Sequence, residues 1–241
     1  MAQSLRRQLR LLQTWAVLSS LGCIVVAVSG FAQSAAPTRI DELTVQRLNV
    51  VDANGTLRLV LANKDRMHPG VMDGITINRP RPVAGLLFFN DEGDEVGGLT
   101  FTGQAQEGPR RASAGLMFDQ FKQDQTVGIS YSEANGERTA GLQVWDRSDR
   151  PLSELIRALN DANALPDADA RERAIQAARA AAPPGPRRVF VGKNPDRSAT
   201  VSLADGAGKP RLTLRVEADG AASIEFLDAD GKVTQRIPSA R

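Results

Sequence analysis

The chain is poor in the residues that build most metal-binding and nucleophilic sites. Its 241 residues include one Cys, one His and only 5% aromatic residues. A single Cys excludes an internal disulfide, and the two residues together supply too few ligands for a Cys/His zinc site. His68 is the only imidazole that a Ser–His–acid triad could use, and no Gly-x-Ser-x-Gly motif accompanies it. We therefore expect His68 to be an exposed loop residue.

Motifs that bind cofactors are missing as well. The sequence contains no Gly-x-Gly-x-x-Gly, no P-loop, no His-Glu-x-x-His and no Cys-x-x-Cys. It predicts no cofactor and no metal site, and it gives no catalytic set. Whether the protein is an enzyme stays open at this point, with the balance against it.

Charge is nearly balanced once the N-terminal segment is set apart. The chain has 30 Lys and Arg against 28 Asp and Glu. Arg6, Arg7 and Arg10 lie in the first 33 residues, which contain no acid, so the remainder has 27 basic against 28 acidic residues. A nucleic-acid-binding domain is basic in its folded part. The sequence therefore predicts no nucleic-acid partner.

The three arginines precede an uncharged apolar segment of 18 residues, 15–32. A positive region followed by an apolar one is typical of a secretory signal or a single-pass anchor, with the N-terminus held inside the cell. As a helix the segment spans about 27 Å, close to the ~30 Å of a hydrocarbon core. Two alternatives remain: a signal cleaved near Ala32, or a retained anchor, which the length favours. We therefore predict that residues 1–36 form a signal peptide or a single-pass anchor and that this part of the chain interacts with the cytoplasmic membrane.

Residues 37–241 are predicted as one β-rich extracytoplasmic domain. Apolar residues alternate with polar or small ones over 127–132 and 212–216, and leucine recurs at every second position over 57–61, as in half-buried strands. Asn-Gly or Asp-Gly occurs at six places, and these dipeptides are typical of tight hairpin turns. We predict a mainly β fold, an antiparallel meander of hairpins forming a sandwich, roll or barrel. Oligomerisation is left open, and a homo-oligomer is one alternative.

One segment departs from the β pattern. Leu152, Leu155, Ile156 and Leu159 have helical spacing, and an Ala-rich stretch follows at 168–182. We predict a helical insertion at about 151–186 between two β halves, with the Ala-rich helix packed loosely.

Acidic residues are densest in a predicted turn that contains Asp91, Glu92, Asp94 and Glu95. Paired carboxylates suit acid–base catalysis or cation binding. Neighbouring residues on a turn point in different directions, so a solvated hairpin tip is the favoured interpretation. The Asp-x-Asn-Gly and Asp-x-Asp-Gly turns that start at Asp52 and Asp228 lack the glutamate at position twelve of a calcium loop, so we predict structural turns there.

A second polar segment, residues 118–125, combines two acids and three glutamines with aromatic residues. Such a segment suits a polar ligand such as a glycan, and a long hairpin turn between Leu116 and Val127 is the favoured alternative. The candidate binding residues from both segments are Asp94, Glu95, Asp119, Gln123, Asp124 and Gln125.

Three blocks resemble a set of uncharacterised bacterial exported or membrane-anchored β-hairpin proteins: residues 43–51 with 55–60, residues 85–99, and residues 118–120 with 123–125. The resemblance covers about the first two-thirds of the chain, and these proteins have no assigned activity. It implies a bacterial origin and an N-terminal anchor, and it nominates Glu95 and the segment 119–125 as features beyond turn chemistry.

Three functions fit these observations. The first is a non-enzymatic, membrane-anchored module on the outer side of the cytoplasmic membrane that binds an envelope protein or a glycan. The second is a carboxylate-dependent, glycosidase-like hydrolase that pairs Asp94 or Glu95 with Asp119 or Asp124. The third is a structural envelope protein that self-assembles.

Overall fold

The computed structural model describes residues 2–31, 39–77, 80–105 and 110–238. The chain divides into two compact units, Met1–Thr44 and Val45–Arg241. Each unit is described by itself.

The first unit contains one helix, α1 (Ala2–Phe31). Its sequence is rich in Ala, Leu, Gln and Arg, which have high helix propensity. Among the residues that the structure describes, no helix combines the length and the apolar character needed to cross a bilayer. The predicted cleavage position at Ala32 lies outside the described residues. The signal or anchor therefore stays a prediction.

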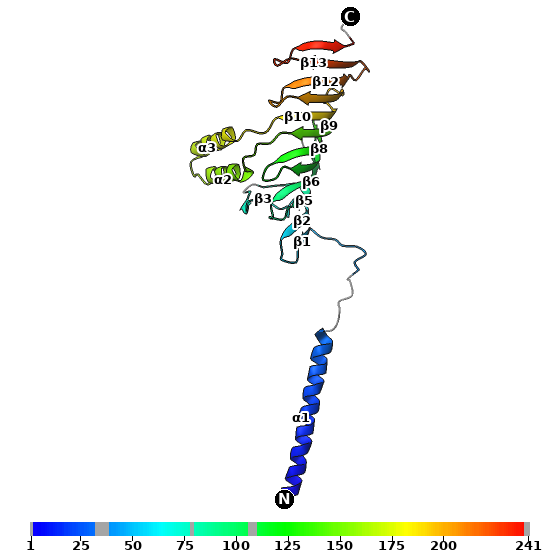
Figure 1. Cartoon of the computed structure of the whole chain (residues 1–241), viewed down its shortest axis with the longest axis vertical. Helices are drawn as coiled ribbons and strands as arrows, with labels where there is room; N and C mark the ends of the chain where they lie inside the picture. The colour runs from blue at the N-terminus through cyan, green and yellow to red at the C-terminus, as the bar shows by residue number, and fades with distance from the viewer. Residues whose placement is uncertain (1, 32–38, 78–79, 106–109, 239–241) are drawn as a thin grey trace. The chain divides into compact units, whose positions relative to one another are not determined.

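The second unit is built on one 12-stranded antiparallel sheet in which the strands follow the chain, apart from one inserted hairpin (Figure 1). The strands of the main sheet are β1 (Arg47–Val51), β2 (Leu57–Ala62), β5 (Ala84–Phe89), β6 (Glu95–Gln104), β7 (Arg111–Asp119), β8 (Gln125–Ala134), β9 (Glu137–Trp145), β10 (Arg187–Lys193), β11 (Ala199–Ala204), β12 (Pro210–Val216), β13 (Ala222–Leu227) and β14 (Val233–Ile237). The mainly β fold and the hairpin meander are therefore confirmed.

Hydrogen bonds in the turns explain the regular hairpins. Asp205 Oδ1 accepts from the main-chain N–H groups of Ala207 and Lys209, at 2.9 and 3.0 Å. Asp228 Oδ1 accepts from Asp230 N and Lys232 N, each at 2.9 Å. These side-chain bonds close the turn before the next strand begins. The Asp228 turn is therefore structural, as predicted, and the Asp52 turn is closed in a similar way, with Asn54 Oδ1 accepting from Thr56 N at 3.0 Å.

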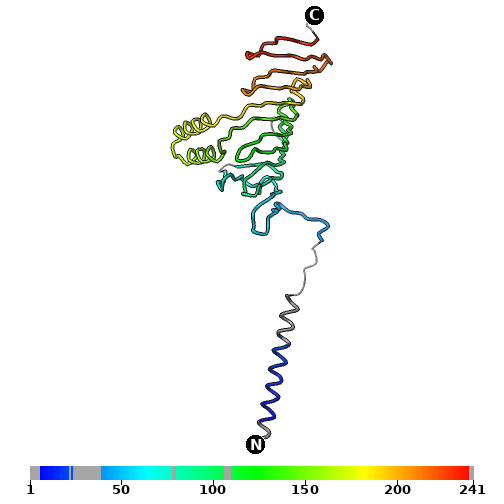
Figure 2. The backbone as a smooth tube through the Cα atoms, in the orientation of Figure 1, coloured from blue at the N-terminus to red at the C-terminus, as the bar shows by residue number. Residues whose placement is uncertain are grey.

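The predicted sandwich, roll or barrel is wrong. In the described part of the chain, β1 and β14 are the two edges of the sheet, and no second large sheet packs against it. Each strand pairs with the next one along the chain, so no long connection carries a strand into another layer. The path of the chain in Figure 2 shows the same succession of hairpins.

Two insertions lie on one side of this sheet, and we call the face on that side the covered face (Figure 1). The first is the hairpin β3 (Val71–Met72) and β4 (Ile75–Thr76), and the second is the helix pair α2 (Leu152–Asn163) and α3 (Ala168–Ala181). Val60, Ala62, Leu87 and Phe89 form the buried core under the first insertion. The predicted helical insertion is thus present, and α3 has no buried residue.

Glycines on the covered face make room for large side chains of neighbouring strands. Gly141 and Gly192 pair across β9 and β10, and the ring of Phe190 lies over both. A Cβ added to Gly141 would lie 2.5 Å from the carbonyl oxygen of Val191 and 2.9 Å from the Phe190 ring. Only glycine fits that close approach.

Candidate functional site

The two polar segments meet at one end of the sheet. Strand β6 begins at Glu95, and β7, its neighbour, ends at Asp119. Strand β8 begins at Gln125, so the turn 120–124 lies beside the acidic turn 90–94. Antiparallel pairing therefore brings together residues that are separated by about 25 positions in the sequence.

Lys122 joins the two turns. Its ammonium Nζ lies 2.6 Å from Asp73 Oδ1 and 2.6 Å from Asp94 Oδ2, and it also contacts Glu92. Asp94 Oδ1 accepts from the main-chain N–H of Asp73 at 2.6 Å. The hydrogen bond from Lys122 lowers the pKa of Asp73, and the acidic surroundings raise the pKa of Lys122.

Because of these contacts, the interpretation of the acidic turn as a solvated tip is wrong for Asp94, which is 1% exposed. The interpretation as a solvated tip is correct for Asp91, whose side chain is 95% exposed. The carboxylates of Asp73, Glu92 and Asp94 lie within 4.8 Å of one another, a spacing that suits a metal ion. The ammonium of Lys122 lies among them, so the chain itself supplies a cation.

Glu95 is held by Arg81. The guanidinium Nη1 donates to Oε1 at 2.9 Å and to Oε2 at 2.8 Å, and both side chains are mostly buried. Gly70 has a φ of +96°, and a Cβ there would lie 2.7 Å from Glu95 Oε2. This position therefore needs glycine both for its backbone angle and for the space beside the ion pair.

Asp119 has a strongly perturbed carboxyl group. Burial raises its pKa to about 7, with added repulsion from Asp124 and Glu95 that Arg147 and Arg81 partly offset. Its Oδ1 atom is buried and has no hydrogen-bond partner among the described residues. A proton on Asp119 is therefore retained close to neutral pH, where it can be given up or taken back.

Asp119 lines a pocket of about 210 Å³ on the covered face. The apolar lining comes from β3 and α2, including Met72, Leu152 and Ile156. The polar lining consists of Arg81, Glu95, Asp119, Asp124, Gln125, Asn160 and Asn163. The structure therefore places four of the six predicted site residues around one pocket.

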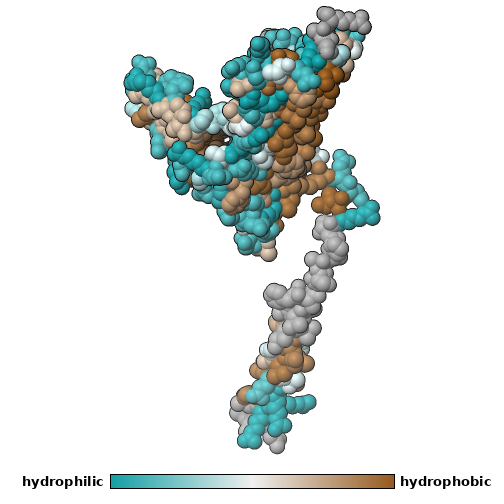
Figure 3. Space-filling model, turned by 45° about the horizontal axis from the view of Figure 1, so that its top comes forward, coloured by the Kyte–Doolittle hydropathy of each residue, from teal (hydrophilic) through white to brown (hydrophobic). Residues whose placement is uncertain are grey.

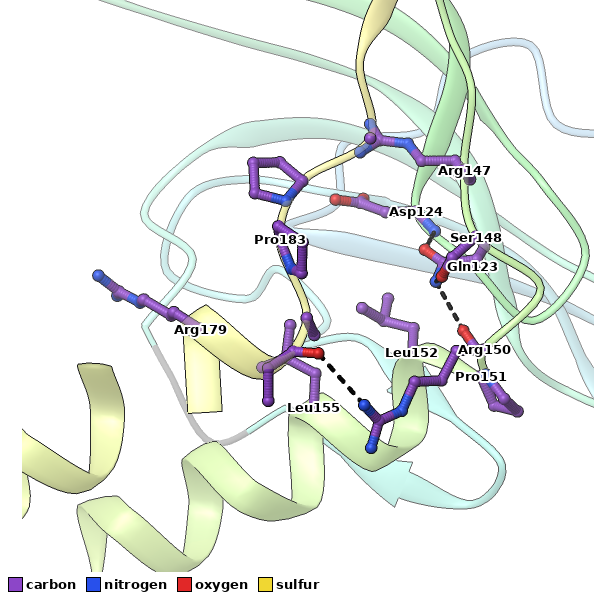
Figure 4. A pocket seen from close by; sticks show the side chains of 14 residues that line it. Gln123, Asp124, Arg147, Ser148, Arg150, Pro151, Leu152, Leu155, Arg179 and Pro183 are labelled. Atoms are coloured by element: carbon purple, nitrogen blue, oxygen red, sulfur yellow. Dashed lines mark hydrogen bonds between the residues drawn. The ribbon is translucent and has the colours of Figure 1, made fainter. Parts of the chain in front are cut away.

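A neighbouring pocket of about 400 Å³ lies between the turn 120–124, the start of α2 and the end of α3 (Figure 4). Gln123 Nε2 donates to Arg150 O at 2.7 Å and to Ser148 Oγ at 3.3 Å. Arg150 Nη1 in turn donates to Ala181 O at 3.2 Å. The side-chain amide of Gln123 thus fastens the connection between β9 and α2, and Asp124 lines both pockets.

Sequence reasoning missed the cations of this region and misplaced His68. Arg81, Lys122 and Arg147 were not among the candidates, because their partners lie far away along the chain. His68 is half-buried rather than exposed: its ring lies 5.0 Å from that of Phe89, edge to face, and Nδ1 accepts from Gly70 N at 3.0 Å. Burial lowers its pKa.

The opposite face of the sheet is a second candidate surface, and we call it the apolar face. Its central row has one residue from each of the twelve strands, and each is Leu, Ile or Val. The row runs through Leu48, Leu61, Leu86, Leu99, Leu116, Ile129, Leu142, Val191, Val201, Leu214, Ile224 and Ile237.

Rows on both sides continue the apolar character. One contains Val50, Leu59, Phe88, Gly97, Phe118, Val127, Val144, Val189, Leu203, Leu212, Phe226 and Gln235. The other contains Ala84, Phe101, Ala114, Tyr131, Ala140, Lys193, Ala199, Val216 and Ala222. Lys193 is the one charged residue in the three rows.

The apolar face is open. Eight members of the central row are between 37% and 59% exposed, with Ile129 the most exposed of them. Figure 3 shows hydrophobic residues gathered along the sheet on the side away from α2 and α3. A contiguous apolar surface of this extent is rare on a monomer and typical of an interaction site.

Compared with known proteins, the chain matches no protein-family model and no curated protein.

Proposed function

We propose that the protein is a non-enzymatic interaction module whose working surface is the apolar face of the sheet. The observation that carries this proposal is the central row, in which each of the twelve strands of the sheet places an aliphatic side chain on this face and eight of these side chains are exposed. A sheet that is apolar on one face needs a second layer against that face. Within Val45–Arg241, the described insertions lie only on the covered side of the sheet, and we assign the apolar face to another molecule.

The N-terminal segment supports an extracytoplasmic location for this module. Arg6, Arg7 and Arg10 before the apolar segment support a signal or anchor that delivers residues 37–241 to the outer side of the cytoplasmic membrane. Envelope proteins are the partners that such a place offers. A glycan is less favoured as partner of the apolar face, because glycan binding depends on polar groups and the three rows contain few of them.

Site-specific photo-crosslinking tests the proposal. A photoreactive residue at Ile129, on the apolar face, is compared with one at Ser113, an exposed residue of β7 on the covered face. We expect adducts from position 129 and none from position 113 when the full chain is expressed in a bacterium and irradiated, with the adduct identified by mass spectrometry. If position 129 forms no adduct, the proposal is refuted.

A second candidate function, a glycosidase-like hydrolase, is favoured by one observation. Asp119 has a pKa of about 7 and shares its pocket with Glu95 and Asp124, so a proton donor and carboxylates lie together. Two features weigh against it. Glu95 is engaged by Arg81, and the pocket of about 210 Å³ is smaller than most ligand pockets.

Hydrolysis of a panel of nitrophenyl glycosides tests this alternative. If the protein is such an enzyme, Asp119→Asn abolishes the release of nitrophenol, whereas Asp149→Asn, at an exposed residue, leaves it unchanged. Absence of release by the native chain removes the hypothesis for these substrates.

A further inference from the structure

We infer that the apolar face is covered by the same face of a second copy of this chain. The inference rests on the proposed function and names its partner. Three features of the described sheet carry it: the size of the face, its distribution of charge and its repeat.

The size of the face matches a stable interface. Twelve strands spaced about 4.8 Å apart extend over about 53 Å. Three rows of side chains, separated by about 6.8 Å along the strands, are about 14 Å wide. The face therefore covers roughly 750 Å² on each copy, and stable protein–protein interfaces bury about 800 Å² on each partner.

Charge is arranged as in an interface between copies. The three rows contain one charged residue, Lys193, at the end of β10. The next row on the same face pairs Glu133 with Arg138, whose Nε lies 3.0 Å from Glu133 Oε2. A second copy therefore meets an apolar centre whose rim carries a paired acid and base.

The repeat of the face selects its partner. Side chains of the central row recur once per strand, at the spacing of the sheet, over all twelve strands. Facing sheets pack about 10 Å apart when the side chains of both inner faces interdigitate. A partner needs the same spacing over the same length to fill this surface, and a second copy has both.

The test measures the mass of the full-length protein by sedimentation in a mild detergent, from micromolar concentration upward and corrected for bound detergent. The native chain should have twice the mass of 25.9 kDa. Ile129→Glu puts a charge at the centre of the face, where it stays solvated in a single copy and is buried between copies. The variant should have the single-chain mass, and Ser113→Glu, with the same charge on the covered face, should keep the native mass.

Ile129→Ser, a milder change, should weaken association at least tenfold, and circular dichroism checks that each variant keeps its strands. A single-chain mass of the native protein at every concentration overturns the inference. The photo-crosslinking experiment separates the two proposals. An adduct of position 129 with another protein overturns this inference and leaves the proposed function standing, whereas no adduct at all removes both.

Discussion

Asp119 gives the protein a dependence of stability on pH that a single substitution should remove. Its pKa is about 7 in the folded chain, compared with 3.8 for an unperturbed Asp. Between these values the folded chain holds a proton that the unfolded chain has released. Stability therefore falls as pH rises from about 4 to about 7, which is the opposite of the usual behaviour of a salt-bridged Asp.

The size of the effect follows from the pKa difference. Each unit corresponds to about 1.36 kcal/mol, so the loss attributable to Asp119 has an upper limit of about 4 kcal/mol above pH 7. Asp119→Asn carries no charge at any pH. The variant should lack this loss and should be more stable than the native protein at pH 8, provided that the amide is accommodated where the carboxyl was.

Urea unfolding of both proteins at intervals from pH 4 to pH 8 measures the difference. Asp149→Asn is the control, because it removes an exposed carboxylate and should keep the native pH profile. Carboxyl carbon chemical shifts give a direct reading of the titration of Asp119. A midpoint near 4 for that carboxyl, or an identical pH profile for Asp119→Asn and the native protein, would refute the reasoning.

Three further predictions concern the covered face. Lys122→Ala leaves three neighbouring carboxylates without their cation, so its unfolding midpoint should drop by several degrees and recover partly with added calcium, which should not affect the native protein. Gly141→Ala should cost about 1–3 kcal/mol in urea unfolding because its Cβ meets the main chain of β10. Gly206→Ala, with no atom within 4 Å of the new Cβ, should be neutral. Phe190→Ala, at a residue 4% exposed, should cost about 3–5 kcal/mol in the same measurement.

Local patterns were sufficient to predict the hairpins. The alternation in 57–61 and 212–216 has the period of a strand, and the turns that precede these strands are closed by bonds within five residues. The helices also follow from local spacing and composition: Leu152 and Ile156 are on one side of α2, and the Ala-rich stretch predicted at 168–182 forms α3. Each of these features depends on neighbours along the chain.

The number of layers could not be predicted in this way. Alternation indicates that one face of a strand is apolar. The same alternation is found whether that face is covered by residues of its own chain or by another molecule. Ile129 and Leu214 were therefore expected in the core of a sandwich, roll or barrel, and they are exposed instead. Whether such a face is buried or exposed depends on the register of the strands and on whether the sheet closes. No local sequence pattern predicts either of these properties.

The candidate residues were predicted better than their partners. Unusual polarity marked Glu95, Asp119 and Asp124, and the structure brings them to one pocket. Arg81 comes from a loop that is rich in proline, and nothing in its sequence points to Glu95, fourteen residues away. Ion pairs of this kind form only when the sheet has placed distant segments side by side.

Because the sheet is a single layer, its two faces should act independently even where they share strands. Strand β8 carries Ile129 on the apolar face and begins at Gln125, beside the pocket. A charge at position 129 is separated from Asp119 by the layer of the sheet, and the groups that set the pKa of Asp119 all lie on the pocket side. Ile129→Glu should therefore change the mass of the protein and leave the titration of the Asp119 carboxyl near 7. A shift of that titration by a whole unit would mean that the faces are coupled, and the interaction surface and the pocket would then have to be treated as one site.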